Sequence, residues 1–262
     1  MSVTDSIQTI LIIGATSGIG EAFARRFHAQ GKQVIATGRR EANLAKIKAD
    51  CPGLKTYVFD VSDLSSIPTN VENLLKQHPD INAIWVNSGV QQSFSFADAK
   101  TIPRDEDLAN EVTVNVTAPI LLAKHFAPHL QRLSKERETF FVITSSGIAY
   151  VPTAPYPVYS ATKAATHHLA VCLRAQLGAT GVRVVEIAPP YVATELDLNH
   201  KAAAGGLEPM PLEEYTDKTL ELLSSTKPAE VKEVGVGFAD MGIKAWRGAF
   251  QPILEHVGMG SA

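Results

Sequence analysis

The fold is decided by residues 9–20, which read TILIIGATSGIG. The apolar, β-branched run Thr9–Ile13 is typical of a buried strand, and the amphipathic stretch Ile19–Gln30 is typical of a helix. Between them stand Gly14, Gly18 and Gly20. A sharp turn, a close approach of backbone to ligand and tight packing of helix on sheet each favour a residue without a Cβ. The segment therefore predicts a strand, a glycine turn and a helix.

This turn is also a candidate nucleotide site. The N-terminus of the helix offers free N–H groups, including that of Ile19, and a partial positive charge to a phosphate. The hydroxyls of Thr16 and Ser17 can add donors. Glycines also serve tight turns for purely structural reasons, but the strand–turn–helix context favours the nucleotide.

The rest of the chain repeats the alternation of strand and helix. Helical periodicity marks the stretches Glu106–Leu133 and Ser160–Leu177. Further apolar runs rich in Val and Ile are Gln33–Thr37, Thr56–Phe59, Ala83–Val86, Thr139–Thr144, Val182–Ile187 and Val234–Phe238. Runs of this kind are strands buried on both faces of a parallel sheet. We predict an α/β fold with a doubly wound parallel sheet, formed by one domain over residues 1–262. Residues 194–211 are a candidate lid over a site or, alternatively, a plain surface loop.

Composition excludes several classes of protein. The chain has 262 residues, 24 basic and 27 acidic, for a net charge of −3. It carries no excess of positive charge for a nucleic acid, and no apolar run approaches the roughly 20 residues that span a bilayer. Two cysteines cannot form a zinc cluster or a disulfide framework, and His125 and His129 stand without further metal ligands. We expect a cytoplasmic protein without a metal, a membrane or a nucleic acid partner, and we expect Cys172 in the core.

The end of the second strand bears on the choice of nucleotide. An acidic residue there binds ribose hydroxyls, whereas arginine accommodates a 2′-phosphate. Here Arg39 and Arg40 follow Gly38, which favours NADP over NAD, with Arg39 the better candidate. The alternative is a solvated helix start. Asp60 and Val61 follow the third strand, where Asp60 is a candidate partner of adenine or, alternatively, a turn residue.

Tyr159 and Lys163 stand four residues apart, on one face of a helix. A nearby cation favours the phenolate and brings a tyrosine pKa toward neutrality, as acid–base catalysis requires. Ser146 lies 13 residues upstream of Tyr159, just past a strand. Asn87 and Gly89 follow another strand, so all are expected at the ligand-binding edge of the sheet.

Together these motifs resemble the short-chain dehydrogenase/reductase family, over nearly the whole chain. The motifs are the glycine turn, Asp60, the Asn87–Gly89 pair, Asn115, Ser146, and the Tyr159–Lys163 pair. The stretch Pro189–Thr194 resembles the family segment that closes over the nicotinamide, and its Pro189-Pro190 variant resembles the DltE-like branch.

The resemblance implies a Rossmann fold with strand order 3-2-1-4-5-6-7 and a homodimer or homotetramer. Tyr159 would exchange a proton with a carbonyl or alcohol oxygen, and Ser146 would hydrogen-bond that oxygen. Lys163 would lower the pKa of Tyr159 and bind the nicotinamide ribose. Asn115 would kink its helix and hold a relay water. Pro189, Val192 and Thr194 would contact the cofactor.

Three positions depart from the family pattern. Ile13 replaces the usual threonine before the first glycine. The usual Asn-Asn-Ala-Gly motif reads Val86-Asn87-Ser88-Gly89 here, so one amide is lost. Pro190 replaces a glycine and stiffens the closing segment. None of these changes removes a catalytic group.

The expected function is NADP-dependent interconversion of a carbonyl and an alcohol on a mainly apolar small molecule. Substrate contacts are expected from Ser146, Ile148, Tyr156 and Tyr191, and from neighbouring residues that include Tyr150 and Val151. Two alternatives remain at this stage. One is an NADP-binding sensor or scaffold without turnover, and the other is a reductase of an imine or enone.

Overall fold

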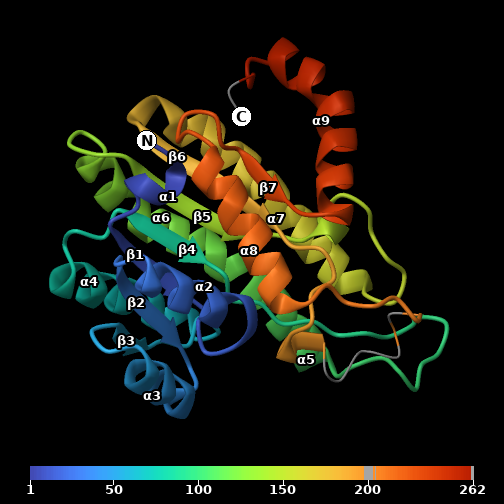
Figure 1. Ribbon diagram of the computed structural model, residues 1–262. Coiled ribbons are helices and arrows are strands. Elements are labelled where there is room, and N and C mark those ends of the chain that lie inside the picture. Colours follow the sequence, from blue (N-terminus) through green and yellow to red (C-terminus); the bar gives the residue numbers. More distant parts are fainter. Residues whose placement is uncertain (198–202, 204, 261–262) are drawn as a thin grey trace.

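The computed structural model describes residues 1–197, 203 and 205–260. Its centre is a parallel sheet of seven strands in the order β3-β2-β1-β4-β5-β6-β7, which confirms the predicted topology (Figure 1). The strands are β1 (Thr9–Ile13), β2 (Gln33–Gly38), β3 (Lys55–Val58), β4 (Ala83–Val86), β5 (Thr139–Thr144), β6 (Val182–Ala188) and β7 (Glu233–Gly235).

Helices cover both faces of this sheet. Side chains alternate along a strand, so Ile10 and Ile12 pack on one face while Leu11 and Ile13 pack on the other. The first face is covered by α1 (Val3–Ser6), α2 (Gly18–Ala29), α3 (Glu41–Asp50) and α8 (Leu212–Ser225). The second is covered by α4 (Ile67–Gln77), α6 (Ala118–Leu133) and α7 (Pro157–Leu177). Burial on both faces explains why the strands read as continuous apolar runs.

Two predicted elements differ from the structure. The stretch predicted as one helix over Glu106–Leu133 is α5 (Asp105–Val112), a π-helical turn η2 (Thr113–Thr117) and then α6. The predicted strand Val234–Phe238 is shorter, because Gly237 has φ +60° and Phe238 begins helix α9 (Phe238–His256). A left-handed residue ends a strand, and here it turns the chain into the last helix.

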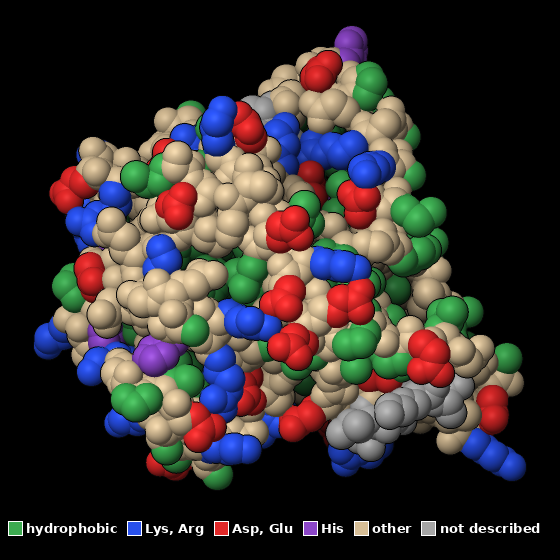
Figure 2. Space-filling model, in the orientation of Figure 1, with side chains coloured by type: hydrophobic (Ala, Val, Ile, Leu, Met, Phe, Trp, Pro, Cys, Tyr) green, Lys and Arg blue, Asp and Glu red, His purple; other side chains and the backbone are tan. Residues whose placement is uncertain are grey.

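Helix α9 extends from the β7 side of the sheet (Figure 1). Met241, Phe250 and Ile253 of this helix are exposed, as is Val257 directly after it. Elsewhere, Figure 2 shows positive and negative side chains interspersed over the face in view. Among the described residues, no helix is both long enough and apolar enough to cross a membrane.

Candidate active site

A cavity of about 1310 Å³ lies at the carboxyl ends of the strands. In a parallel sheet with this strand order, ligands bind at that edge. Four of the candidate site residues do not line it: Gly20, Asn115, Tyr150 and Val151. Those that do are Gly14, Thr16, Ser17, Gly18, Ile19, Arg39, Arg40, Asp60, Val61, Asn87, Gly89, Ser146, Ile148, Tyr156, Tyr159, Lys163, Pro189, Tyr191, Val192 and Thr194.

The glycine turn is packed too closely for side chains. Gly14 has φ +92°, and a Cβ there would lie 2.6 Å from the backbone nitrogen of Ser88. A Cβ on Gly20 would lie 2.1 Å from the carbonyl oxygen of Gly14. Ser17 caps α2 without a hydrogen bond from its side chain to the helix. The first turn of α2 therefore meets the cavity with bare backbone, which fits a pyrophosphate.

Asn87 supports this turn from the neighbouring strand. Its Nδ2 donates to the carbonyl oxygen of Gly14 over 3.1 Å, and its Oδ1 accepts from the hydroxyl of Thr144 over 3.1 Å. The indole of Trp85 donates to the same hydroxyl over 2.8 Å. The amide thus connects the glycine turn to the end of β5.

The two arginines differ in their surroundings. Arg40 donates to Thr16 Oγ1 over 3.0 Å and to Ser17 Oγ, and it forms an ion pair with Glu195 at 2.8 Å. Arg39 is exposed at the cavity and has no hydrogen-bond or ion-pair partner among the described residues. A 2′-phosphate would therefore find one unengaged guanidinium, that of Arg39.

Asp60 lines the cavity and also holds a turn. Its Oδ1 accepts from the backbone nitrogen of Ser62 over 3.0 Å and from the Ser62 hydroxyl over 2.8 Å. Both interpretations of this residue from the sequence are therefore compatible with its position, since one carboxylate oxygen has no such bond.

Tyr159, Lys163 and Ser146 converge on the cavity from two elements. Lys163 is 3% exposed, and its ammonium donates to the carbonyl oxygen of Thr144 over 2.9 Å. The ammonium lies 5.4 Å from the centre of the Tyr159 ring. Ser146 caps the short helix η3 (Gly147–Ala149), where its Oγ accepts from the nitrogen of Ile148 over 3.4 Å.

Burial shifts the pKa values of both titratable groups of this site. Burial lowers the pKa of Lys163 to about 8, against the opposing charges of Glu186 and Glu111. The pKa of Tyr159 lies above its ordinary value, because the phenol is buried and Glu111 lies nearby. The effect of the Lys163 ammonium on the phenol stays a prediction.

Asn115 lies in the π-helical turn η2, behind the cavity. Its Nδ2 donates to the carbonyl oxygen of Val90 over 2.8 Å and to Thr162 Oγ1 over 3.1 Å, while its Oδ1 accepts from the nitrogen of Val90 over 3.0 Å. The carbonyl oxygen of Asn115 accepts from the hydroxyl of Thr166 over 3.1 Å. The helix is thus interrupted here, and the side chain fixes the loop after β4.

The substrate end of the cavity partly matches its prediction. Ile148, Tyr156 and Tyr191 line it, as does Asp197. Tyr150 and Val151 were expected there and do not line it; Tyr150 instead turns toward β6.

The candidate lid is joined at its two ends, because the nitrogen of Met210 donates to the carbonyl oxygen of Tyr191 over 2.8 Å and that of Ala193 to the carbonyl oxygen of Met210 over 2.9 Å. Residues 198–202 and 204 of this segment lie outside the described residues.

The structure also places two histidines and Cys172. His129 is buried, with Nε2 bonded to the carbonyl oxygen of Ile81 over 2.8 Å, so it is not a surface residue. His167 is buried within the chain. Cys172 is exposed rather than in the core, because it lies on the face of α7 that turns away from the sheet.

Two buried carboxylates near the site were missed by the sequence analysis. Glu111 of α5 and Glu186 of β6 are each 0% exposed. Neither oxygen of Glu111 has a hydrogen-bond partner among the described residues, and burial raises its pKa to about 7. Glu186 interrupts the apolar run VRVVEIA, and an acid inside a buried strand is the signal that would have pointed to it.

Comparison with known proteins identifies the class of this fold and site. A family model described as short chain dehydrogenase matches residues 8–204. The chain is 37% identical over 236 residues to a Bacillus subtilis (strain 168) protein, named uncharacterized oxidoreductase DltE, and covers 90% of it with 88% of its own length. It is 34% identical over 191 residues to serine 3-dehydrogenase of Rhizobium radiobacter, which covers 72% of this chain and 74% of the relative.

The chain therefore belongs to the short-chain dehydrogenase/reductase family of oxidoreductases. Within that family it belongs to the DltE-like branch.

Solved structures share the fold. A short-chain dehydrogenase from Sphingobium yanoikuyae in complex with NADPH has a TM-score of 0.78 at 24% identity, covering 95% of each chain. A 3-ketoacyl-(acyl-carrier-protein) reductase from Brucella melitensis complexed with NADH has a TM-score of 0.78 at 21% identity, covering 88% of this chain and 98% of that one. The family and these neighbours support a nicotinamide nucleotide as the cofactor.

Proposed function

We propose that the protein is an NADP-dependent oxidoreductase that interconverts a carbonyl group and an alcohol on a small, mainly apolar molecule. One observation carries this proposal. Ser146, Tyr159 and Lys163 line the same cavity as the glycine turn, so a proton donor and a phosphate site face one volume.

The residues divide the chemistry among them. Bound NADP supplies or accepts the hydride. In the direction of reduction, the Tyr159 hydroxyl gives its proton to the carbonyl oxygen while the Ser146 hydroxyl donates a hydrogen bond to that oxygen. The Lys163 ammonium stabilises the phenolate that remains on Tyr159. Its bond to Thr144 holds that ammonium in place.

The preference for NADP is supported by Arg39. This guanidinium lies at the cavity, at the end of β2, without another partner among the described residues. The end of β2 reads Gly38-Arg39-Arg40, without the carboxylate that would bind the ribose hydroxyls of NAD. The nearby carboxylate of Asp60 follows β3, the next strand of the sheet.

Binding and turnover of the purified protein test this function. We expect NADPH to bind more tightly than NADH, and NADPH absorbance to decay with a member of a ketone and aldehyde panel. Tyr159→Phe should lower turnover by roughly a hundredfold to ten-thousandfold while NADPH binding persists. NADPH binding without turnover on any carbonyl would instead favour a sensor, and turnover only on imines or enones would favour a different acceptor.

A second substrate class, an alcohol that carries an ammonium group, is favoured by Asp197. This buried carboxylate lines the cavity, and its Oδ2 accepts from the hydroxyl of Tyr191. Its Oδ1 has no hydrogen-bond partner among the described residues. Serine 3-dehydrogenase of Rhizobium radiobacter is a relative whose name implies such a substrate. Oxidation of 3-hydroxy amino acids with NADP, abolished by Asp197→Asn, would establish this class.

We also propose that residues 1–262 act as one domain with a lid at 194–211, and that two or four copies assemble. The exposed apolar side chains of α9 support assembly. The helices that carry His125 and His167, α6 and α7, are further candidates for the interface, although the His167 side chain itself is buried within the chain. Sedimentation of the intact protein measures the number of copies.

A further inference from the structure

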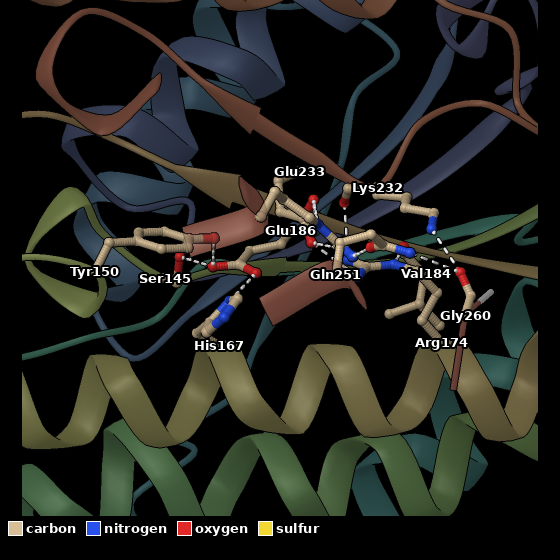
Figure 3. A network of polar contacts seen from close by, with 11 residues as sticks. Ser145, Tyr150, His167, Arg174, Val184, Glu186, Lys232, Glu233, Gln251 and Gly260 are labelled. Carbon is tan, nitrogen blue, oxygen red and sulfur yellow. Dashed lines mark hydrogen bonds and ion pairs between the residues drawn. The ribbon is translucent and has the colours of Figure 1, made fainter. Parts of the chain in front are cut away.

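Glu186 carries a fully buried carboxylate in the middle of β6. A buried charge is retained only where several partners satisfy it, because its desolvation is costly. Figure 3 shows three such partners, Ser145, Tyr150 and His167, pointing at this carboxylate. Ser145 directly follows β5, Tyr150 directly follows the short helix η3, and His167 lies in α7.

Each partner adjoins a residue of the candidate active site. The hydroxyl of Ser145, next to Ser146 in the chain, donates to Glu186 Oε1. The hydroxyl of Tyr150, at the end of the short helix η3 that Ser146 begins, donates to the same oxygen over 2.8 Å. One carboxylate therefore holds the backbone on both sides of Ser146.

The third partner comes from α7. Nδ1–H of His167 donates to Glu186 Oε2 over 2.8 Å. His167 stands one helical turn beyond Lys163 and two beyond Tyr159. The same carboxylate therefore links the segment of Ser146 to the helix that carries the other two residues. Trp246 of α9 packs edge-on against His167, with ring centres 4.4 Å apart, and closes this group from outside.

We propose that Glu186 is a positioning residue for the active site, which fixes the segment of Ser146 relative to the helix of Tyr159 and Lys163. This inference rests on the proposed function. The three hydrogen bonds of the carboxylate provide the positioning. The charge of the carboxylate also affects the pKa of Lys163. The negative charge of Glu186 opposes the lowering of the Lys163 pKa by burial, as does that of Glu111. Of the described residues, these two carboxylates and the Tyr159 phenol are the titratable groups that face the Lys163 ammonium from β6, α5 and α7.

Glu233 offers a matched control on the next strand. It is the register partner of Glu186 in the pairing of β6 with β7, and its side chain is 5% exposed. Its carboxylate pairs with Arg174 at 2.9 Å and with Arg247, and none of these three residues lines the cavity. Both glutamates are buried ion-pair acceptors, but only one is bonded to the segment of Ser146.

The test compares Glu186→Gln and Glu233→Gln in the full chain, with kcat and KM for a ketone that the wild type reduces. We expect Glu186→Gln to lower kcat by roughly tenfold to a hundredfold with little change in KM, as a displaced reacting group does. Glu233→Gln should lower the melting temperature without lowering kcat. Equal kcat in Glu186→Gln and wild type, with only a loss of stability, would overturn the proposal.

One further measurement separates failure of this proposal from failure of the proposed function. The affinity for NADPH is measured against pH, because Lys163 is a candidate ligand of the nicotinamide ribose. Affinity for NADPH should fall at the alkaline pH where Lys163 loses its proton. Without the Glu186 charge this fall should occur at a lower pH, whereas in Glu233→Gln it should occur at the same pH as in the wild type. This measurement needs no turnover, so it applies even if the wild type reduces no carbonyl. If affinity for NADPH is lost at the same alkaline pH in Glu186→Gln as in the wild type, the proposed role of Glu186 is rejected.

Should Glu186→Gln fail to fold, Tyr150→Phe removes one hydrogen bond to the carboxylate and keeps the ring. We expect this variant to fold and to bind NADPH, with kcat lowered several-fold. An unchanged kcat in folded Tyr150→Phe would contradict the proposal.

Discussion

The ammonium of Lys163 donates a 2.9 Å hydrogen bond to the carbonyl oxygen of Thr144, the last residue of β5. This contact joins α7, the helix that carries Tyr159, to the strand that leads directly into Ser145 and Ser146. It also encloses a positive charge in the interior, since Lys163 is almost completely buried. We expect this buried charge to favour turnover and to lower the free energy of unfolding. The two effects can be measured separately.

Replacing this charge should stabilise the fold and inactivate the protein. Burial lowers the pKa of Lys163 from 10.5 to about 8, so between these values the unfolded chain binds a proton that the folded chain does not. Stability contributed by this group therefore rises with pH across that window. At pH 7 we expect Lys163→Met to be more stable by about 2 kcal/mol, because the shift corresponds to about 3 kcal/mol and the lost bond to Thr144 takes away about 1 kcal/mol.

Urea unfolding at pH 7 and near pH 10 measures this change, and the advantage of Lys163→Met should shrink at the higher pH. Turnover should fall by at least about a hundredfold, because the phenolate loses its neighbouring cation. A variant less stable than wild type at both pH values would show that the buried ammonium is not a cost to the fold.

Glu111 should show the opposite dependence on pH. Burial raises its pKa from 4.5 to about 7, so between these values the folded chain binds a proton that the unfolded chain has lost. Stability contributed by this group therefore falls as pH rises across that window. Glu111→Gln resembles the protonated carboxyl, and we expect it to raise the free energy of unfolding at pH 8 by roughly 1–3 kcal/mol. At pH 4 the variant and the wild type should unfold alike, and an equal gain at both values would refute the assignment.

Local patterns predicted the sheet because each strand is buried on both faces and therefore reads as an apolar run. They also placed the glycine turn and the Tyr159–Lys163 pair at one edge, since helical spacing and strand ends are local properties. The apolar periodicity continues through the π-helical turn at Asn115, so only the family resemblance indicated that the helix is interrupted there. The role of Glu186 in the network was equally hidden, since its partners Ser145 and Tyr150 lie 41 and 36 residues away in the chain.

The glycine turn should tolerate no side chain at Gly20. A Cβ there would lie 2.1 Å from the carbonyl oxygen of Gly14, so the backbone would have to move. We expect Gly20→Ala to lose about 1–3 kcal/mol of stability and most of its affinity for NADPH. Gly248→Ala is the control, because this exposed position in α9 has nothing within 4 Å of the added Cβ. That variant should gain about 0.5–1 kcal/mol and bind NADPH normally, and normal binding by Gly20→Ala would separate the turn from the cofactor.

Arg39 and Arg40 should contribute unequally to the choice between NADPH and NADH. Arg40 is engaged by Glu195, Thr16 and Ser17, whereas Arg39 faces the cavity without a partner among the described residues. We expect Arg39→Ala to weaken NADPH binding by roughly 10- to 100-fold, the usual effect of losing hydrogen bonds to a charged group, and to leave NADH binding unchanged.

Arg40→Ala is the comparison for this prediction, with both dissociation constants measured by nucleotide fluorescence. It should affect the two nucleotides more evenly, because its contacts support the turn at Thr16 and Ser17 rather than meeting a 2′-phosphate alone. If Arg39→Ala weakened NADH as much as NADPH, the guanidinium would act on the turn or the ribose. The preference for NADP would then have to come from Arg40, whose ion pair with Glu195 would open to admit the phosphate.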